Sequence, residues 1–131
     1  MTDGGKANKT GRVAETLIAC MLKENDIQFH SQYIIGTSIY GNPLHHDFVL
    51  PDIKIIIEVK WQQYGGSADE KYPLLVANLK QQEGYRSIIV VDGGGAKPKS
   101  IEWIINQIDE KLIGVFTISE FIKFINNGGL R

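Results

Sequence analysis

The stretch of sequence that decides the fold covers residues 45–61 and reads HHDFVLPDIKIIIEVKW. Its two apolar segments, joined by the turn formers Pro and Asp at 51–52, predict the two β-strands of a hairpin. Side chains in a strand alternate between faces, so residues two apart share a face. Asp47 therefore lies on one face of the first strand, and Glu58 and Lys60 share one face of the second.

The position of the turn decides which residues face each other across this hairpin. If the loop is 52–53, Asp47 lies directly opposite Glu58. If the loop is 51–52, a type I turn, Glu58 is the diagonal neighbour of Asp47, roughly 7–8 Å away at Cβ. Both registers place Asp47, Glu58 and Lys60 on one face, whereas a slip of one residue would turn a whole strand over.

Two carboxylates and a lysine among isoleucines need a compensating partner. An unpartnered buried acid is costly, and neighbouring acids repel each other. A hard divalent cation removes both penalties, because Mg²⁺ binds one or two carboxylates and keeps waters for substrate phosphates. Lys60 would then position or deprotonate a water, or hold a phosphate oxygen. The alternative is a half-buried ion pair between Lys60 and either acid, and the shared face with the apolar lead-in favours the metal site.

The order Asp47, ten residues, then Glu58-Val59-Lys60 resembles the motif of the PD-(D/E)XK nuclease superfamily. The resemblance covers most of the chain, because the elements on both sides of the hairpin also fit. It implies that Asp47, Glu58 and the main-chain carbonyl of Val59 hold Mg²⁺, with Mn²⁺ as a substitute. The literal Pro-Asp departs from the pattern, because only five residues separate Asp52 from Glu58. Asp47 is therefore taken as the ligand, and Asp52 as a turn residue and the alternative ligand.

Length and composition predict one intracellular domain. The 131 residues have a net charge of −1, so a DNA-binding surface must come from local clusters of basic residues. Cys20 is the only cysteine, which excludes an internal disulfide and a cysteine-based zinc cluster. The sequence shows neither a membrane span nor a signal-peptide pattern, so a cytoplasmic location is expected. The polar residues 1–9 are expected to be flexible, and 10–131 to form the domain.

A helix is predicted over residues 10–25, with Thr10 as its N-cap. Glu15 borders its apolar stripe, and in an isolated helix it would be a solvated surface residue. The run GRVAE at 11–15, however, resembles the first helix of the superfamily, especially that of Holliday-junction resolvases. This resemblance implies that Glu15 points at the metal site as a catalytic residue and a further ligand. The apolar positions of the stripe are Val13, Ala14, Leu17, Ile18, Met21 and Leu22.

Further substrate contacts are expected around the hairpin and the first helix. Lys9 and Arg12 would meet DNA phosphates or remain solvated. Adjacent strand residues point to opposite faces, so His45 is a candidate substrate contact while its neighbour His46 is expected to be a satisfied core histidine. Two more candidates follow the hairpin: Gln62, which would bind a water or phosphate, and Lys71, which would bind phosphate at a helix N-terminus or be a surface lysine.

The remaining elements complete an α/β fold. Strands are predicted over 27–35, 86–92 and 112–116, and helices over 69–83, from Ser100 onwards and from Ser119 to about 127. With the hairpin and first helix, this order matches the restriction-endonuclease-like fold, a central mixed sheet with an αβββαβ core, followed by a C-terminal αβα extension. The Gly-rich loop 93–99 lacks the Gly-Lys-Ser/Thr ending of a P-loop, which argues against a nucleotide-binding protein.

The resemblance implies a Mg²⁺-dependent DNA endonuclease that leaves 5′-phosphates and acts as a homodimer or as a subunit of a larger nuclease complex. The run 61–71 and the near-neutral charge resemble restriction-type members, whereas the small size and the helix at 11–15 suit a Holliday-junction resolvase. A non-catalytic DNA-binding module of the same fold is the alternative from another class. The presence of Asp47, Glu58 and Lys60 together argues against it.

Overall fold

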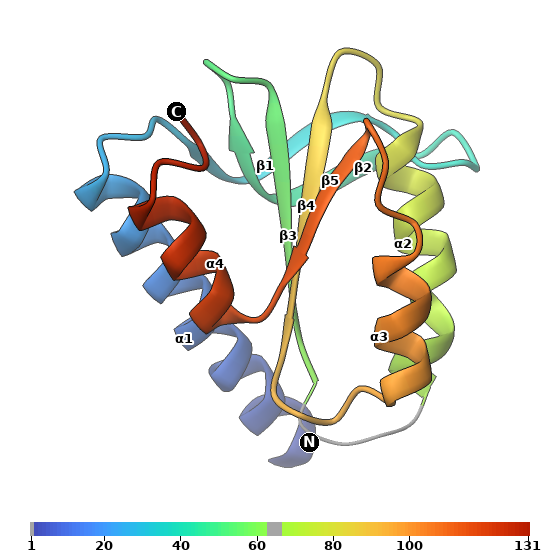
Figure 1. The fold of residues 1–131 in the computed structure, drawn as a ribbon. Coiled ribbons are helices and arrows are strands. Elements are labelled where there is room, and N and C mark those ends of the chain that lie inside the picture. The colour runs from blue at the N-terminus through green and yellow to red at the C-terminus, as the bar shows by residue number, and fades with distance from the viewer. Residues whose placement is uncertain (1, 63–66) are drawn as a thin grey trace.

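A five-stranded mixed sheet, in the order β1-β2-β3-β4-β5, lies between two layers of helices (Figure 1). The structure, a computed structural model, describes the backbone of residues 2–62 and 67–131 and the side chains of 11–62 and 69–131. The elements are α1 (Thr2–Glu24), β1 (His30–Thr37), β2 (Pro43–Leu50), β3 (Ile55–Trp61), the 3-10 helix η1 (Ser67–Lys71), α2 (Tyr72–Lys80), β4 (Arg86–Asp92), α3 (Pro98–Ile105), β5 (Leu112–Phe116) and α4 (Ile118–Asn126). This order confirms the predicted core and extension.

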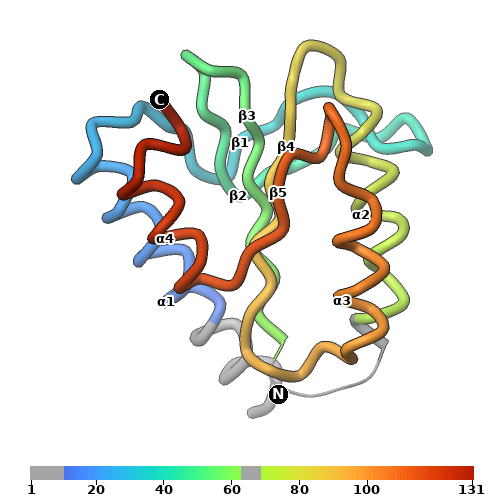
Figure 2. The backbone as a smooth tube through the Cα atoms, in the orientation of Figure 1, coloured from blue at the N-terminus to red at the C-terminus, as the bar shows by residue number. Residues whose placement is uncertain are grey.

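The two helix layers cover opposite faces of the sheet. Helices α1 and α4 lie side by side on one face, and α2 and α3 on the other, as the ribbon and the backbone tube both show (Figures 1 and 2). Strand β3 pairs antiparallel with β2 and parallel with β4, so it is the middle strand of the five. The strand that carries Glu58 and Lys60 is thereby supported by a neighbour on each side and a helix layer on each face.

Two apolar layers hold this arrangement together. The first, under α1 and α4, includes Ile18, Phe48, Ile57, Phe121 and Ile125, and the second, under α2 and α3, includes Val49, Ile56, Val76, Leu79 and Ile104. Each fully buried side chain of this size contributes about 1.5–3 kcal/mol relative to an exposed one. Because the isoleucines of β3 alternate between the two layers, both faces of this strand are buried, as in the central strands of a sheet covered on both sides.

The hairpin adopts the first of the two predicted registers. Phe48 pairs with Ile57 and Leu50 with Ile55, which is the register that directs Asp47 towards Glu58. The connection is longer than the predicted two-residue loop, because residues 51–54 all belong to the turn. Proline has no N–H to donate, so a turn that starts at residue 51 leaves no ladder hydrogen bond unmade.

Helix α1 begins at Thr2, not at Thr10 as predicted, so the backbone of residues 2–9 is helical. Once a helix is nucleated, each further residue adds a hydrogen bond at little extra cost, and polar residues can extend it. The buried stripe is also narrower than the prediction. Val13 and Leu17 are 63% and 41% exposed, while the buried positions are Ala14, Ile18 and Leu22.

Helix α3 begins at Pro98, with Lys97 at the N-cap position, so the predicted cap at Ser100 is wrong. Proline suits the first helical position, because its fixed φ is already helical and its missing N–H would have no partner there. The helix ends at Ile105, which is 46% exposed, and Ile108 lies beyond it and is 43% exposed. Both isoleucines are therefore only partly buried.

The other boundaries differ from the prediction by a few residues at most. Strands β4 and β5 have the predicted limits, and β1 covers 30–37 instead of 27–35. Helix α2 follows the 3-10 turn and starts at Tyr72 rather than at Asp69. Helix α4 starts at Ile118 because Thr117 and Glu120 form a capping box, in which each side chain binds the backbone N–H of the other.

Candidate active site

Strands β2 and β3 are joined by carboxylates where their backbone pairing ends. Past the pair Phe48–Ile57, Asp47 Oδ2 accepts a hydrogen bond from the Val59 N–H at 2.8 Å. In the other direction, Glu58 Oε1 accepts one from the Asp47 N–H at 3.3 Å. Carboxylate oxygens thus take the place of ladder carbonyls at this point. Both acids are brought together between the two strands, as the chosen register requires.

Asp52, the alternative ligand, is exposed in the turn 51–54. It lines a separate hollow together with Asn25, Asp26 and Arg131. The aspartate that adjoins Glu58 is therefore Asp47.

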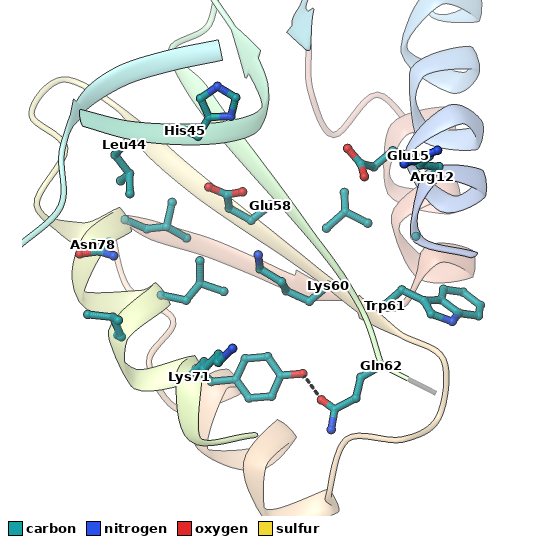
Figure 3. A pocket seen from close by; sticks show the side chains of 16 residues that line it. Arg12, Glu15, Leu44, His45, Glu58, Lys60, Trp61, Gln62, Lys71 and Asn78 are labelled. Carbon is teal, nitrogen blue, oxygen red and sulfur yellow. Dashed lines mark hydrogen bonds between the residues drawn. The ribbon is translucent and has the colours of Figure 1, made fainter. Parts of the chain in front are cut away.

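A cavity of about 770 Å³ opens beside Glu58, between α1, the end of β3 and α2 (Figure 3). Asp47 is not among the residues that line it, and it adjoins the cavity through its hydrogen bonds to Glu58 and Val59. The side chain of Lys9 lies outside the described residues. The predicted site residues that do line the cavity are Arg12, Glu15, His45, Glu58, Val59 (whose main-chain carbonyl is the predicted ligand), Lys60, Gln62 and Lys71.

Glu15 faces the cavity from α1, across from the side chains of α2 (Figure 3). Its carboxylate Oε1 accepts a hydrogen bond from Gln32 Nε2 at 2.7 Å. Partial burial raises the pKa of Glu15 above its ordinary value, and the nearby charge of Asp47 raises it further, whereas Gln32 and Lys60 act in the opposite direction. Glu15 is therefore electrostatically part of the acidic site.

Gln32 is a site residue that the sequence analysis did not identify. Besides Glu15, its Nε2 reaches Asp47 Oδ1 at 3.5 Å, so one amide group lies between two carboxylates. Its backbone has a φ of 49°, in the left-handed region that few residues other than glycine adopt. The flanking pairs Ser31–Phe48 and Tyr33–His46 place Gln32 opposite Asp47. Only the pairing of β1 with β2 shows that Gln32 lies beside Glu15 and Asp47, because the local sequence around Gln32 does not indicate this placement.

Glu58 is 5% exposed and is held by a buried histidine. Burial raises the pKa of Glu58, the hydrogen bond with His46 lowers it, and the charge of Asp47 raises it again. His46 Nδ1 lies 2.8 Å from Glu58 Oε2, and its Nε2 lies 3.0 Å from the Ile35 carbonyl oxygen. The predicted satisfied core histidine is confirmed. Since a carbonyl oxygen only accepts, Nε2 is the ring nitrogen that donates to Ile35.

Lys60 extends from the same end of β3 into the cavity, beside Glu58 (Figure 3). Its charge acts to lower the pKa values of Glu15 and Glu58. Within the described side chains no ion pair joins Lys60 to these acids or to Asp47. The alternative interpretation of Lys60 as one half of a buried ion pair therefore finds no support, and its side chain lines the cavity.

Gln62 and Lys71 occupy the α2 side of the cavity in different ways. Tyr72 Oη donates to Gln62 Oε1 at 2.6 Å, while Gln62 Nε2 donates to Asp69 Oδ2 and to the Gly95 carbonyl, both at 3.4 Å. The buried Gln62 thus anchors η1 and the loop after β4. Lys71 is exposed at the N-terminal end of α2, directly after the acidic Asp69 and Glu70 of η1.

The donor set of the site suits a hard divalent cation. Two carboxylates, from Asp47 and Glu58, and the Val59 carbonyl are the oxygen ligands that Mg²⁺ prefers. Burial, together with the nearby charge of Asp47, raises the pKa values of Glu15 and Glu58, and a bound cation would favour their ionised forms. In the part of the chain whose side chains are described, no three His, Cys, Asp or Glu side chains are close enough to hold a metal together. Glu15 is therefore not preassembled with the other two acids.

Comparison with known proteins agrees with this geometry. A family model described as the PD-(D/E)XK nuclease superfamily domain matches residues 6–128, nearly the whole chain. No curated protein and no solved structure matches with significance. The fold is consistent with the restriction-endonuclease-like architecture of that superfamily, whose members are typically nucleases and generally use divalent metals. The site at the junction of β2 and β3 and the match along the sequence lead to one conclusion: this chain belongs to the PD-(D/E)XK nuclease superfamily.

Proposed function

We propose that the protein is a Mg²⁺-dependent DNA endonuclease that hydrolyses phosphodiester bonds. The observation that carries the proposal is the reciprocal bonding of Asp47 and Glu58 at the point where Lys60 enters the cavity. Membership of the superfamily supports a nuclease-type function. The choice of Mg²⁺ follows from the oxygen-only donor set, for which Mn²⁺ is the natural substitute.

Each residue of the site has a distinct part in this proposal. Asp47, Glu58 and the Val59 carbonyl would hold the metal, which when bound stabilises the charge that develops on the scissile phosphate. Lys60 Nζ would orient the attacking water or accept its proton. Glu15, on the α1 side, would form a second hydrogen bond with that water.

Basic side chains at the two sides of the cavity would position the DNA backbone. Arg12 lies on α1 and Lys71 at the start of α2, so phosphates on either side of the scissile bond would meet a cation. Lys9, one turn before Arg12, and His45, which lines the cavity, remain predicted contacts. Gln62 is buried and its amide holds η1 and the loop after β4, so it would support the phosphate-binding side of the cavity without contacting the phosphate itself.

Cutting two strands of a DNA substrate requires two active sites, which a homodimer or a larger nuclease complex would supply. The proposed role is that of a cytoplasmic nuclease of the restriction type or a nuclease subunit of a DNA-processing system, with a Holliday-junction resolvase as the alternative. Among the described residues, no helix combines the length and apolarity that crossing a lipid bilayer requires.

The proposal is tested by incubating the protein with labelled linear duplex, single strands and a four-way junction. Reactions contain Mg²⁺, Mn²⁺, Ca²⁺ or a chelator, because Ca²⁺ separates binding from cleavage. Glu58→Ala and Lys60→Ala are compared with matched controls on exposed helix positions away from the cavity, Glu102→Ala and Lys123→Ala. We expect cutting with Mg²⁺ that falls about 100-fold or more in the first two variants.

The control variants should cut at the rate of the natural protein. Cutting that persists without any divalent ion, or that survives in Glu58→Ala, would contradict the proposed site. DNA binding without cutting under all conditions would replace the nuclease by a non-catalytic DNA-binding module. A preference for the four-way junction would identify a Holliday-junction resolvase.

A further inference from the structure

The cavity beside Glu58 continues past the predicted catalytic residues into a region of different chemistry. Arg12 and Glu15 lie at one end, Glu58 and Lys60 in the middle, and Asn78 beyond them at the other end (Figure 3). This far end is walled by side chains of β2 and α2 that are almost all apolar, and it is called the apolar lobe: Leu44, Leu74, Leu75, Asn78 and Leu79.

Hydrolysis of a phosphodiester does not by itself require the apolar lobe. A metal ion, a phosphate and a water interact with charged and polar groups, which the other end of the cavity supplies. The whole cavity, at about 770 Å³, falls in the range that encloses a small organic ligand. Leu74 is 39% exposed on its wall, so apolar surface faces water until a ligand covers it. The ligand part that enters the lobe must therefore be largely apolar and attached to the phosphate.

The wall of the lobe is held in place and carries one oriented polar group. Asn78 Oδ1 accepts a hydrogen bond from the Ile39 N–H at 2.9 Å, which leaves the Nδ2 amino group as a donor at the cavity. Gln81 and Gln82 both donate to the Thr37 carbonyl, at 2.7 and 2.8 Å, and fasten the β1–β2 loop to α2. An apolar hollow with an amide donor on its rim suits a nucleobase, whose edge carries nitrogen and oxygen acceptors.

We infer that the apolar lobe receives the base of an unpaired nucleotide next to the scissile phosphate. The substrate is then single-stranded or locally unpaired DNA rather than continuous duplex. In a continuous duplex every base is stacked inside the helix, and it can enter a pocket only after leaving the stack, which is easiest where it is already unpaired. The inference rests on the proposed nuclease function and adds its substrate class.

The test uses one labelled oligonucleotide as a single strand and in a fully paired duplex, with Mg²⁺. A single abasic nucleotide is then moved through the single strand, which removes one base but keeps the phosphates. We expect the single strand to be cut faster than the duplex. Cutting at the one phosphate on a fixed side of the abasic nucleotide should fall roughly tenfold, while the other cuts stay unchanged.

Leu74→Ala and Asn78→Ala identify where the base binds. In both variants the tenfold difference between base and abasic nucleotide should shrink to about twofold, because the groups that contact the base are gone. Leu17→Ala is the matched control, since Leu17 has a similar exposure, 41%, and does not line the cavity. The measured quantity is a ratio within one reaction, so a change in overall activity or folded fraction does not affect it.

Equal cutting of single strand and duplex, or an abasic effect that the two variants leave unchanged, would overturn this inference and leave the nuclease function standing. The absence of metal-dependent cutting of every substrate by the natural protein would overturn the proposed function and the inference with it.

Discussion

Asp47 and Glu58 each accept a hydrogen bond from the backbone of the opposite strand. Asp47 binds the N–H of Val59, and Glu58 binds the N–H of Asp47 itself, at 2.8 and 3.3 Å. The two carboxylates therefore accept hydrogen bonds that backbone carbonyls accept elsewhere in the sheet, and the same bonds direct both side chains to one place. Replacing either side chain should therefore change both the proposed function and the local stability of the hairpin.

Asp47→Asn and Asp47→Ala separate these two roles. Both remove a negative charge from the proposed metal site, and both should weaken binding of Mg²⁺ by an order of magnitude or more. Asparagine keeps an oxygen that can accept from Val59, whereas alanine leaves that N–H without its partner. We expect Asp47→Ala to be less stable than Asp47→Asn by about 1 kcal/mol. Calorimetric titration with Mg²⁺ and urea unfolding measure the two effects, and equal stability of the variants would contradict the structural role.

Glu58→Gln tests the cost of the buried acid. Because the folded pKa of Glu58 is raised above its ordinary 4.5, the folded protein holds this proton more tightly than the unfolded chain. The associated stability is fully present below pH 4.5 and is lost as the pH rises through the folded pKa. Glutamine mimics the protonated form of Glu58. Without metal, the Tm of the variant relative to that of the natural protein should therefore increase as the pH rises. A Tm difference that stays constant from about pH 4 to about pH 8 would contradict this.

His46→Phe removes the ring that is hydrogen-bonded to Glu58. Both ring nitrogens of the buried His46 have partners, Nδ1 with Glu58 Oε2 and Nε2 with the Ile35 carbonyl oxygen. Leaving these partners unpaired should cost about 1–3 kcal/mol of unfolding free energy. His45→Phe is the matched control, because the neighbouring histidine is exposed, and it should stay within about 0.5 kcal/mol of the natural protein. Urea unfolding measures both, and similar losses in the two variants would contradict the assigned bonds.

Gln32→Ala removes the amide between Glu15 and Asp47. The hydrogen bond from Gln32 favours the ionised form of Glu15 and lowers its pKa against burial and the charge of Asp47. Without it the pKa of Glu15 should rise further. NMR titration of the side-chain carboxyl carbons follows this directly. An unchanged or lower pKa of Glu15 in the variant would show that Gln32 does not act on it in solution.

Asp109→Asn probes stability far from the site. Asp109 accepts hydrogen bonds from Lys80 Nζ at 2.7 Å and from the N–H groups of Lys111 and Leu112, which lower its pKa from 3.8 to about 2. A depressed pKa adds stability above the unfolded value of 3.8, and this stability is lost as the pH falls through about 2. The variant should melt below the natural protein at pH 6, and the gap should close on acidification. Thermal unfolding across this range measures it, with Asp26→Asn, an exposed aspartate, as control.

The hairpin shows why part of the site was predictable. Alternation along a strand depends on local backbone geometry alone, so the sequence predicts that Glu58 and Lys60 share a face and that Asp47 adjoins them. The apolar run of β3 and the continuous run of β4 likewise predict central strands. The choice between the two registers was open, because both turns are locally acceptable, and the packing of the strands into the two apolar layers selects one.

Helix ends were less predictable than strands. Capping residues compete at neighbouring positions, and each of Thr10, Ser100 and Ser119 is a reasonable local start. The structure begins these helices at Thr2, Pro98 and Ile118 instead. Small differences of free energy between adjacent start points decide among them, and tertiary packing contributes as much as the cap itself.

The sequence by itself determined the order of the elements and the shared face of Asp47, Glu58 and Lys60, because these follow from short-range periodicity and spacing. Only the tertiary structure decided that Gln32 lies between Glu15 and Asp47. It also decided that His46 holds Glu58 and that leucines of α2 extend the cavity. Such contacts join residues far apart in the chain, and they depend on strand register and helix docking, which are set by burial of the whole core rather than by any local pattern.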